Sequence, residues 1–198
     1  MTAPFGMPTR PLRLALALFV ATVLCACAPR PRTVPEPPRA PEIASPALPD
    51  TGIALVVYKE RRLLTVMSDG FPLHEFPVVV GRRNHGPKRF EGDNRTPEGL
   101  YRVTQKRAHP RWRYFIEIDY PNGHDVSAYV AEIEEGRVPV FDGEFPGMGG
   151  RVGIHGSDKP IEQAAGFDWT QGCVAMDNDG IARVYELVDA GTPVLILP

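Results

Sequence analysis

Eight prolines lie between residues 29 and 50, and they restrict which part of this chain can fold. Proline fixes its own φ and has no backbone N–H, so a segment this rich in proline holds neither a helix nor a paired strand. We predict that residues 28–50 form a disordered, Pro-rich linker of extended polyproline II structure, with a reach of roughly 70 Å. A recognition motif for another domain is the alternative. Residues 51–198 remain for one folded domain with a sizeable core.

Residues 1–27, which precede the linker, have the pattern of an export signal. Arg10 and Arg13 are followed by an apolar run over residues 14–24. The run is about as long as the apolar part of a signal peptide, and it is shorter than the roughly 20 residues of a membrane-spanning helix. We expect this segment to direct the protein out of the cytoplasm.

The signal ends in Leu-Cys-Ala-Cys at residues 24–27, which resembles the bacterial lipobox. In a lipobox a small residue precedes a cysteine that is lipidated and becomes the first residue after cleavage. Cys27 fits this role better than Cys25, which follows the bulky Leu24. Cleavage of an ordinary secretory signal near the same point is the alternative. The lipobox predicts a periplasmic lipoprotein anchored to a membrane by Cys27, and Ala28 favours the outer membrane because it is not the Asp that retains lipoproteins in the inner one.

Residues 51–198 alternate short apolar, β-branched runs with turn residues, which is typical of strands. Two segments have helical periodicity instead, one over residues 126–133 behind an Asp125 cap and one over residues 181–188 before Gly191. The sequence therefore predicts a mainly β domain with a few helices. The expected strands are residues 53–58, 63–67, 76–80, 99–104, 115–119, 151–154, 174–176 and 194–197.

Charge is distributed unevenly along this domain. Residues 82–113 carry 10 Lys or Arg against 3 Asp or Glu, whereas residues 114–198 carry 4 against 15. Export and the absence of a motif that reads RNA or DNA argue against a nucleic-acid partner. Two interpretations remain: surface charge that folds back against the acidic half, or a basic rim for an anionic, carboxylate-rich polymer.

Cys173 is the only cysteine outside the signal region. If Cys25 is removed and Cys27 is lipidated, its thiol has no disulfide partner in an oxidising compartment, and a free thiol there needs an explanation. A small buried hydrophobic residue is the structural alternative. Gly172 before it and a strand-like run after it favour a nucleophile on a tight loop. The amides of Gly172 and Cys173 would then face a developing oxyanion.

His155, in the sequence Gly-Ile-His-Gly at residues 153–156, is the candidate base for this thiol. An unperturbed thiol has a pKa of about 8.5, so it needs an adjacent base or cation at neutral pH. We interpret the other four histidines, which lie in polar stretches, as surface residues. One Cys and one His make an incomplete zinc site, so we expect no metal and no cofactor. The order of His before Cys also differs from that of papain-like hydrolases.

The order and spacing of these residues resemble the L,D-transpeptidase catalytic domain, also called the YkuD domain. That family carries a histidine, a spacer and then Ser/Thr-x-Gly-Cys-x-x-x-x-Asn. Here 14 residues separate His155 from Thr170, and residues 170–178 read Thr-Gln-Gly-Cys-Val-Ala-Met-Asp-Asn. The Gly-Pro-Lys turn at residues 86–88 and Thr-Pro-Glu-Gly at residues 96–99 also match, so the resemblance covers most of residues 52–197.

The resemblance implies an L,D-transpeptidase-type fold, similar to a β-sandwich or barrel, over residues 51–198. It implies that Cys173 attacks the L-centre carbonyl of meso-diaminopimelate in a peptidoglycan stem peptide. His155 would be the proton donor and acceptor, the Gly156 carbonyl would orient its ring, and Gly172 would stabilise the oxyanion.

Five further residues are candidates for the substrate pocket: Thr170, Trp169, Asn178, Lys88 and Arg95. Thr170 would shape the pocket and Trp169 would form one wall, although a core position suits the indole equally. Lys88 and Arg95 would bind stem carboxylates, and an ordinary surface role is their alternative. Asn178 fits support of the loop or a helix cap better than contact with substrate.

Many family members carry Arg two residues after the cysteine, where this chain has Ala175. With Trp169, the chain resembles a lipoprotein member of the branch whose core is Trp-Thr-x-Gly-Cys-Ile/Val-Ala. That branch contains cross-linking transpeptidases and also relatives that hydrolyse the bond between peptidoglycan and an attached lipoprotein. The branch implies a transferase of peptidoglycan biosynthesis that passes a thioester to an amine acceptor. An amidase that releases a wall-linked lipoprotein with the same site, and a non-catalytic wall-binding lipoprotein, are the alternatives. The expected partners are stem peptides, with a wall-linked lipoprotein as a further option, and a membrane through the lipid.

Overall fold

The computed structural model describes residues 48–198. The predicted signal peptide, the lipidation site at Cys27 and all of the linker except residues 48–50 lie outside the described residues. Within residues 48–198 no helix has the length and apolar character needed to cross a membrane.

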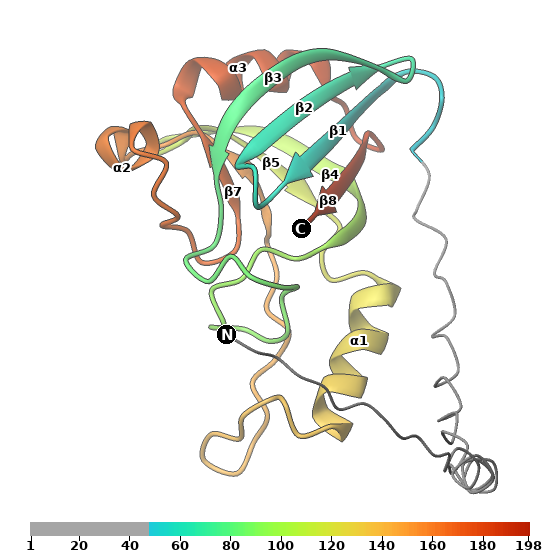
Figure 1. The fold of residues 1–198 in the computed structure, drawn as a ribbon, viewed down its shortest axis with the longest axis vertical. Coiled ribbons are helices and arrows are strands. Elements are labelled where there is room, and N and C mark those ends of the chain that lie inside the picture. Colours follow the sequence, from blue (N-terminus) through green and yellow to red (C-terminus); the bar gives the residue numbers. More distant parts are fainter. Residues whose placement is uncertain (1–47) are drawn as a thin grey trace, which may run out of the picture. The chain divides into compact units, whose positions relative to one another are not determined.

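Eight strands form a closed barrel, with neighbours in the order β1-β2-β3-β7-β6-β5-β4-β8 (Figure 1). This confirms the predicted mainly β fold. The strands are β1 (Ile53–Tyr58), β2 (Leu63–Ser68), β3 (Phe71–Val79), β4 (Gly99–His109), β5 (Arg113–Ile118), β6 (Gly153–His155), β7 (Val174–Met176) and β8 (Pro193–Leu197). Each predicted strand overlaps one of them, although β3 begins earlier and β4 extends further than the sequence indicated.

Two strands, β8 and β7, close the barrel, and each pairs with two neighbours. Strand β8 pairs in parallel with β1, where Leu55 is opposite Val194, and antiparallel with β4, where Tyr101 is opposite Val194. Strand β7 lies between β3 and β6, with Val79 opposite Ala175 on the β3 side. The interior is filled by alternate side chains of the strands, because residues along a strand point to opposite faces.

Residues 48–198 contain three helices, α1 (Gly123–Glu134), α2 (Pro160–Ala164) and α3 (Asn178–Leu187). The prediction that Asp125 caps α1 is wrong: Asn122 is the cap, and its side chain accepts from the Asp125 amide while the Asp125 carboxylate accepts from the Asn122 amide. This reciprocal pair is a capping box, in which Asp125 is the third residue of the helix. The short α2 was not predicted, because five residues are too few to show a helical period.

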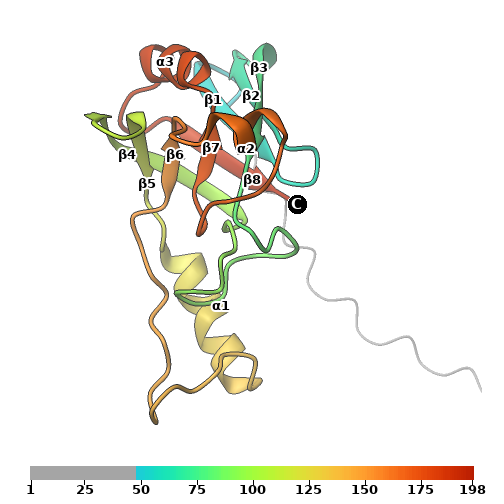
Figure 2. The ribbon, with the colours of Figure 1, turned by 90° about the vertical axis from the view of Figure 1, so that its left-hand side faces the viewer.

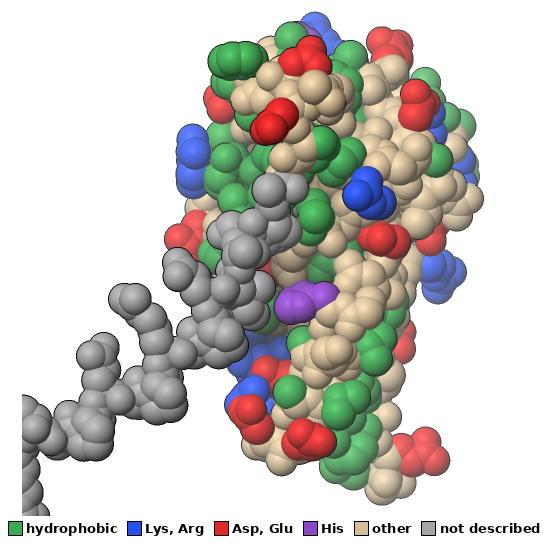
Figure 3. Space-filling model, turned by 90° about the vertical axis from the view of Figure 1, so that its right-hand side faces the viewer, with side chains coloured by type: hydrophobic (Ala, Val, Ile, Leu, Met, Phe, Trp, Pro, Cys, Tyr) green, Lys and Arg blue, Asp and Glu red, His purple; other side chains and the backbone are tan. Residues whose placement is uncertain are grey.

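Helix α1 and the loop after it project away from the barrel, which Figures 1 and 2 show from two directions. The projection carries several exposed hydrophobic residues, and hydrophobic side chains gather on it in Figure 3. These are Val126, Val130, Val140, Phe141 and Phe145. The catalytic candidates lie elsewhere, on β6 and at the start of β7.

Candidate active site

Strands β6 and β7 are neighbours and run parallel, with Ile154 opposite Val174 and His155 opposite Ala175 (Figure 2). Ile154 and Val174 are buried in the barrel core. His155 therefore points to the outer face, since side chains alternate along a strand. Cys173 lies two residues before Ala175 and shares that face. The structure thus brings the predicted base and the predicted nucleophile onto the same side of adjacent strands.

Two glycines next to these residues allow the close packing. A Cβ on Gly153 would lie 2.4 Å from the Ile116 carbonyl oxygen, and a Cβ on Gly156 would lie 2.3 Å from the Trp112 carbonyl oxygen. Both distances are shorter than real Cβ contacts allow, so only glycine fits without a shift of the backbone. The Gly-Ile-His-Gly sequence thus reflects how tightly β6 is packed.

His155 is almost completely buried, with 1% of its surface exposed. Its Nδ1 lies 2.6 Å from the carbonyl oxygen of Gly156, which is the arrangement that the family resemblance implies. A carbonyl only accepts hydrogen bonds, so Nδ1 carries the proton and Nε2 is left as the basic nitrogen. Burial lowers the pKa of His155 to about 4, although the bond to Gly156 opposes this, and the imidazole is therefore neutral at neutral pH.

Trp112, at the tip of the β4–β5 hairpin, covers the imidazole. Its ring is stacked on that of His155, with 4.1 Å between the ring centroids and 20° between the planes. The indole Nε1 donates to Asp158 Oδ1 over 3.1 Å, and the same carboxylate pairs with Arg111. Trp169 approaches the imidazole edge-on, with centroids 5.8 Å apart. We did not predict a role for Trp112, and an aromatic residue inside an otherwise polar hairpin tip is the one signal that marks it.

The Cys173 thiol lies under the backbone of the loop that leads into β6. Its Sγ is 3.9 Å from the Arg151 carbonyl oxygen, a weak thiol hydrogen bond, and Arg151 adopts a φ of 53°, which is unusual for a non-glycine residue. Burial raises the pKa of the thiol to about 11, and a hydrogen bond from the Gly153 amide and the charge of Lys88 only partly oppose it. The resting site therefore holds a neutral thiol.

The thiol lies in a pocket of about 440 Å³. Aromatic side chains of the β4–β5 hairpin, Trp112 and Phe115, form part of the wall. Three basic residues, Lys88, Arg107 and Arg151, also line it, against one acidic residue, Glu91. A pocket with apolar walls and several cations suits a substrate that carries carboxylates. Arg107 and Arg151 were not among the predicted site residues.

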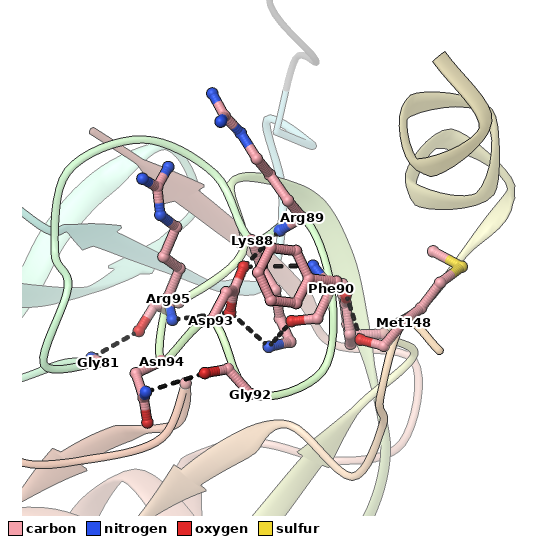
Figure 4. A network of polar contacts seen from close by, with 12 residues as sticks. Gly81, Lys88, Arg89, Phe90, Gly92, Asp93, Asn94, Arg95 and Met148 are labelled. Carbon is pink, nitrogen blue, oxygen red and sulfur yellow. Dashed lines mark hydrogen bonds and ion pairs between the residues drawn. The ribbon is translucent and has the colours of Figure 1, made fainter. Parts of the chain in front are cut away.

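Lys88 reaches this pocket, but its ammonium already has partners (Figure 4). Its Nζ donates to Asp93 Oδ1 over 2.8 Å and to the Phe90 carbonyl over 2.9 Å. The buried Asp93 also accepts from the backbone amides of Arg89, Phe90 and Arg95, so one carboxylate organises the whole turn. We therefore assign Lys88 first to holding this wall, and only second to the predicted contact with a stem carboxylate.

Thr170 holds the loop that carries Cys173, residues 170–173, which we call the cysteine loop, through two hydrogen bonds. Its Oγ1 donates to the Cys173 carbonyl over 2.7 Å and accepts from the Gly172 amide over 3.1 Å. Gly172 needs to be glycine, because its φ is +142° and a Cβ would lie 2.8 Å from the Arg95 carbonyl oxygen. In this structure the Gly172 N–H is thus bonded to Thr170, and the role of that amide toward an oxyanion stays a prediction.

The remaining predicted residues lie outside the thiol pocket. Asn178 exchanges two hydrogen bonds with the backbone of Ser157, each 3.1 Å long, and so clamps the turn after His155. It is not the helix cap, which is Asp177. Trp169 contacts the imidazole without lining the pocket, and the Arg95 side chain lines a different pocket. Among residues 48–198, no three His, Cys, Asp or Glu side chains are grouped so that they could hold a metal ion.

Comparisons with known proteins agree with this fold. A sequence profile of the YkuD family, the L,D-transpeptidase catalytic domain, matches residues 52–196. YafK of Escherichia coli (strain K12), which is provisionally named as an L,D-transpeptidase, is 27% identical over 142 residues, which are 69% of this chain and 47% of YafK. YqjB of Bacillus subtilis (strain 168), with the same provisional name, is 28% identical over 144 residues, which are 72% of this chain and 69% of YqjB. The chain thus spans about half the length of YafK.

Solved structures share the fold. The helical cell shape determining protein Pgp2 from Campylobacter jejuni aligns with a TM-score of 0.54 and 24% identity, over 74% of this chain and 48% of Pgp2. Bd1075 of Bdellovibrio bacteriovorus aligns with a TM-score of 0.51 and 22% identity, over 77% of this chain and 50% of Bd1075. With the profile match over most of the described residues, these comparisons show that the chain belongs to the L,D-transpeptidase catalytic domain (YkuD) family.

Proposed function

We propose that this protein is a cysteine L,D-transpeptidase that modifies peptidoglycan. One observation carries the proposal: the register of β6 and β7 places the Cys173 thiol and the His155 imidazole on one face, beside a basic pocket. The bond from Nδ1 to the Gly156 carbonyl leaves Nε2 as the base, so no third acidic residue is needed to fix the tautomer.

In the acylation step the Cys173 sulfur attacks the L-centre carbonyl of meso-diaminopimelate in a stem peptide. The thiol proton moves to Nε2 of His155 as the carbon–sulfur bond forms, because the resting thiol and imidazole are both neutral. The tetrahedral intermediate then breaks its bond to the D-amino acid, and His155 returns the proton to the leaving amine. An acceptor amine attacks the thioester in the second step and releases the thiol.

The oxyanion of that intermediate needs hydrogen-bond donors. The Gly172 amide is bonded to Thr170 Oγ1, so the Cys173 amide is the remaining donor of the two that we predicted. The Thr170 hydroxyl fixes the loop through the Cys173 carbonyl. We assign Thr170 as a positioning residue for the loop that carries the nucleophile.

The substrate class follows from the charges around the thiol. Arg107 and Arg151 line the pocket and have no ion-pair partner among residues 48–198. Their guanidinium groups match the free carboxylates of a stem peptide, which bind such groups through paired hydrogen bonds. The aromatic wall of the hairpin would pack against the aliphatic part of the diaminopimelate chain.

The test is turnover by the purified protein with two separate substrates, a disaccharide tetrapeptide and a muropeptide that carries a linked lipoprotein fragment. We expect new cross-linked or exchanged products from the tetrapeptide, and we expect Cys173→Ala to abolish them without a change in thermal unfolding. Release of the lipoprotein fragment alone would identify the amidase instead. If wild type and Cys173→Ala form the same new products, Cys173 is not the nucleophile and the proposal is wrong; if neither protein changes either substrate, the non-catalytic wall-binding lipoprotein remains.

We further propose that the protein is exported to the periplasm and lipidated at Cys27, with Ala28 directing it to the outer membrane. The lipobox-like residues 24–27 support this proposal. Cys27→Ala should then lose the mass of the lipid and move from the membrane fraction to the soluble fraction. An unmodified wild-type chain in the soluble fraction would contradict the proposal.

A further inference from the structure

A second pocket, of about 670 Å³, is lined by four arginines. They come from separate parts of the chain: the β1–β2 turn, the segment after β3, and the segment before β4. The four are Arg62, Arg82, Arg83 and Arg95. None of the residues that line this pocket also lines the thiol pocket, so the two are distinct.

Two of the four guanidinium groups are held by neighbouring residues. Arg62 binds Asp168 through two hydrogen bonds, of 3.2 Å from Nε and 3.0 Å from the terminal nitrogen. Arg82 donates from Nε to the Trp169 carbonyl over 3.1 Å. These bonds attach the pocket to residues 168–170, which lead directly into the cysteine loop.

The other two guanidinium groups have no partner. Arg83 and Arg95 make no side-chain hydrogen bond or ion pair with any residue between 48 and 198. Figure 4 shows the Arg95 guanidinium directed away from the Asp93 carboxylate, to which its own backbone amide is bonded. Like charges repel at close range, so the binding of an anion reduces the repulsion between these guanidinium groups.

The pocket also contains acidic groups that limit which anion fits. Glu60 lines it without an ion-pair partner in the described residues, and Asp168 contributes a second carboxylate that Arg62 neutralises. A compact, doubly charged phosphate would meet the repulsion of Glu60. A ligand with carboxylates for the arginines and an ammonium for Glu60 satisfies both signs of charge.

We propose that this arginine pocket is a second binding site for stem peptides, which recognises the zwitterionic end of a diaminopimelate side chain outside the catalytic pocket. The inference rests on the proposed function, because it takes peptidoglycan as the substrate. A polymer presents many stems, so a second contact raises the effective concentration of substrate at the thiol without taking part in chemistry. It also gives a structural role to part of the basic stretch at residues 82–113, for which a rim for a carboxylate-rich polymer was one of two interpretations.

The direct test is NMR of the arginine Nε–H signals in full-length Cys173→Ala protein, which binds without turnover. The probes are free meso-diaminopimelate, a disaccharide tripeptide and inorganic phosphate. We expect the first two to shift the signals of Arg83 and Arg95, and Arg83→Gln to weaken this binding about tenfold. Arg83→Lys should keep part of the binding, since lysine retains the positive charge but lacks the paired N–H donors of the guanidinium group. Arg183→Gln, an exposed arginine of α3, is the matched control and should change nothing.

The kinetic consequence separates this site from the catalytic one. Arg83→Gln should raise KM for intact sacculi and leave kcat for a soluble tetrapeptide unchanged. The inference is overturned if the peptides shift only Arg107 and Arg151, or if phosphate binds as well as the tripeptide. Because the NMR measurement needs no turnover, a failure of the proposed enzymatic activity would appear in the wild-type assay and would be distinguishable from a failure of this site.

Discussion

The thiol pocket and the arginine pocket are lined by different parts of one segment, residues 168–173, and they differ in how their ionisable groups are buried. In the thiol pocket burial keeps the reactive groups uncharged, since it lowers the pKa of His155 and raises that of Cys173. In the arginine pocket the guanidinium groups are half-exposed or exposed, and three of the four have no counter-ion in the described residues. The first arrangement suits bond making, which needs tightly fixed atoms. The second suits reversible binding of a charged ligand, which tolerates movement.

Of the variants considered, Gly156→Ala should have the largest effect on stability and turnover, because it disturbs the rigid thiol pocket. The added Cβ would overlap Asn178 Oδ1 and the Trp112 carbonyl, each 2.3 Å away, so the turn that holds His155 must shift. We expect a loss of about 3 kcal/mol or more in unfolding free energy and about a hundredfold or more in turnover. Urea unfolding and the muropeptide assay measure the two effects. Gly123→Ala, where nothing lies within 4 Å, is the control; equal behaviour of the two variants would show that the thiol pocket is not rigid.

A smaller effect is expected from the pH dependence of His155. Its pKa is about 4 in the folded protein and near 6.5 in the unfolded chain, so the unfolded chain binds more protons between these values. Stability from this group is therefore complete above about pH 6.5 and is lost as the pH falls to about 4, by about 3 kcal/mol in total. Trp112→Leu uncovers the ring and should raise the pKa of His155 by about one to two units. NMR titration of the imidazole measures this, and an unchanged titration would show that Trp112 does not keep water away.

The smallest effect concerns how the two pockets respond to solution conditions. The rate of Cys173 alkylation by iodoacetamide should keep rising up to about pH 11, whereas that of a free thiol would level off near pH 8.5.

Added salt should change this alkylation rate little. It should weaken stem-peptide binding at Arg83, since salt screens exposed charges much more than buried ones. Intact mass and NMR titration follow the two processes. A plateau of alkylation near pH 8.5 would remove the contrast between the pockets.

Much of the architecture could be predicted from local sequence. The β-branched runs mark strands, and the glycines around His155 and Cys173 mark the places where β6 and β7 pack tightly. The spacing of His155 and Cys173 in the sequence predicted a catalytic pair. The structure brings the two residues together because β6 and β7 are adjacent parallel strands. Their pairing itself depends on the rest of the barrel, which no local pattern contains.

Other features depend on contacts between distant segments. Trp112 covers His155 only because β5 pairs with β6, and its aromatic ring in a polar hairpin tip marks the residue without indicating this contact. The Gly172 amide was expected to be free, but a threonine hydroxyl two residues earlier competes for it, as Ser and Thr side chains often do in turns. Arg95 was assigned to the thiol pocket from its position in the motif. Only its backbone contacts the cysteine loop, while its side chain turns toward the other arginines.

Closure of the barrel also determines when the thiol acquires its properties during folding. Strand β8 must join β1 and β4, and β7 must join β3, before the structure around Cys173 is complete. Pairings between such distant segments form slowly. Until they form, the thiol has the acidity of an ordinary cysteine, and its thiolate is open to peroxide. The folded barrel should therefore protect the Cys173 thiol from oxidation, and peroxide should modify the unfolded chain faster than the folded one, which intact mass can measure.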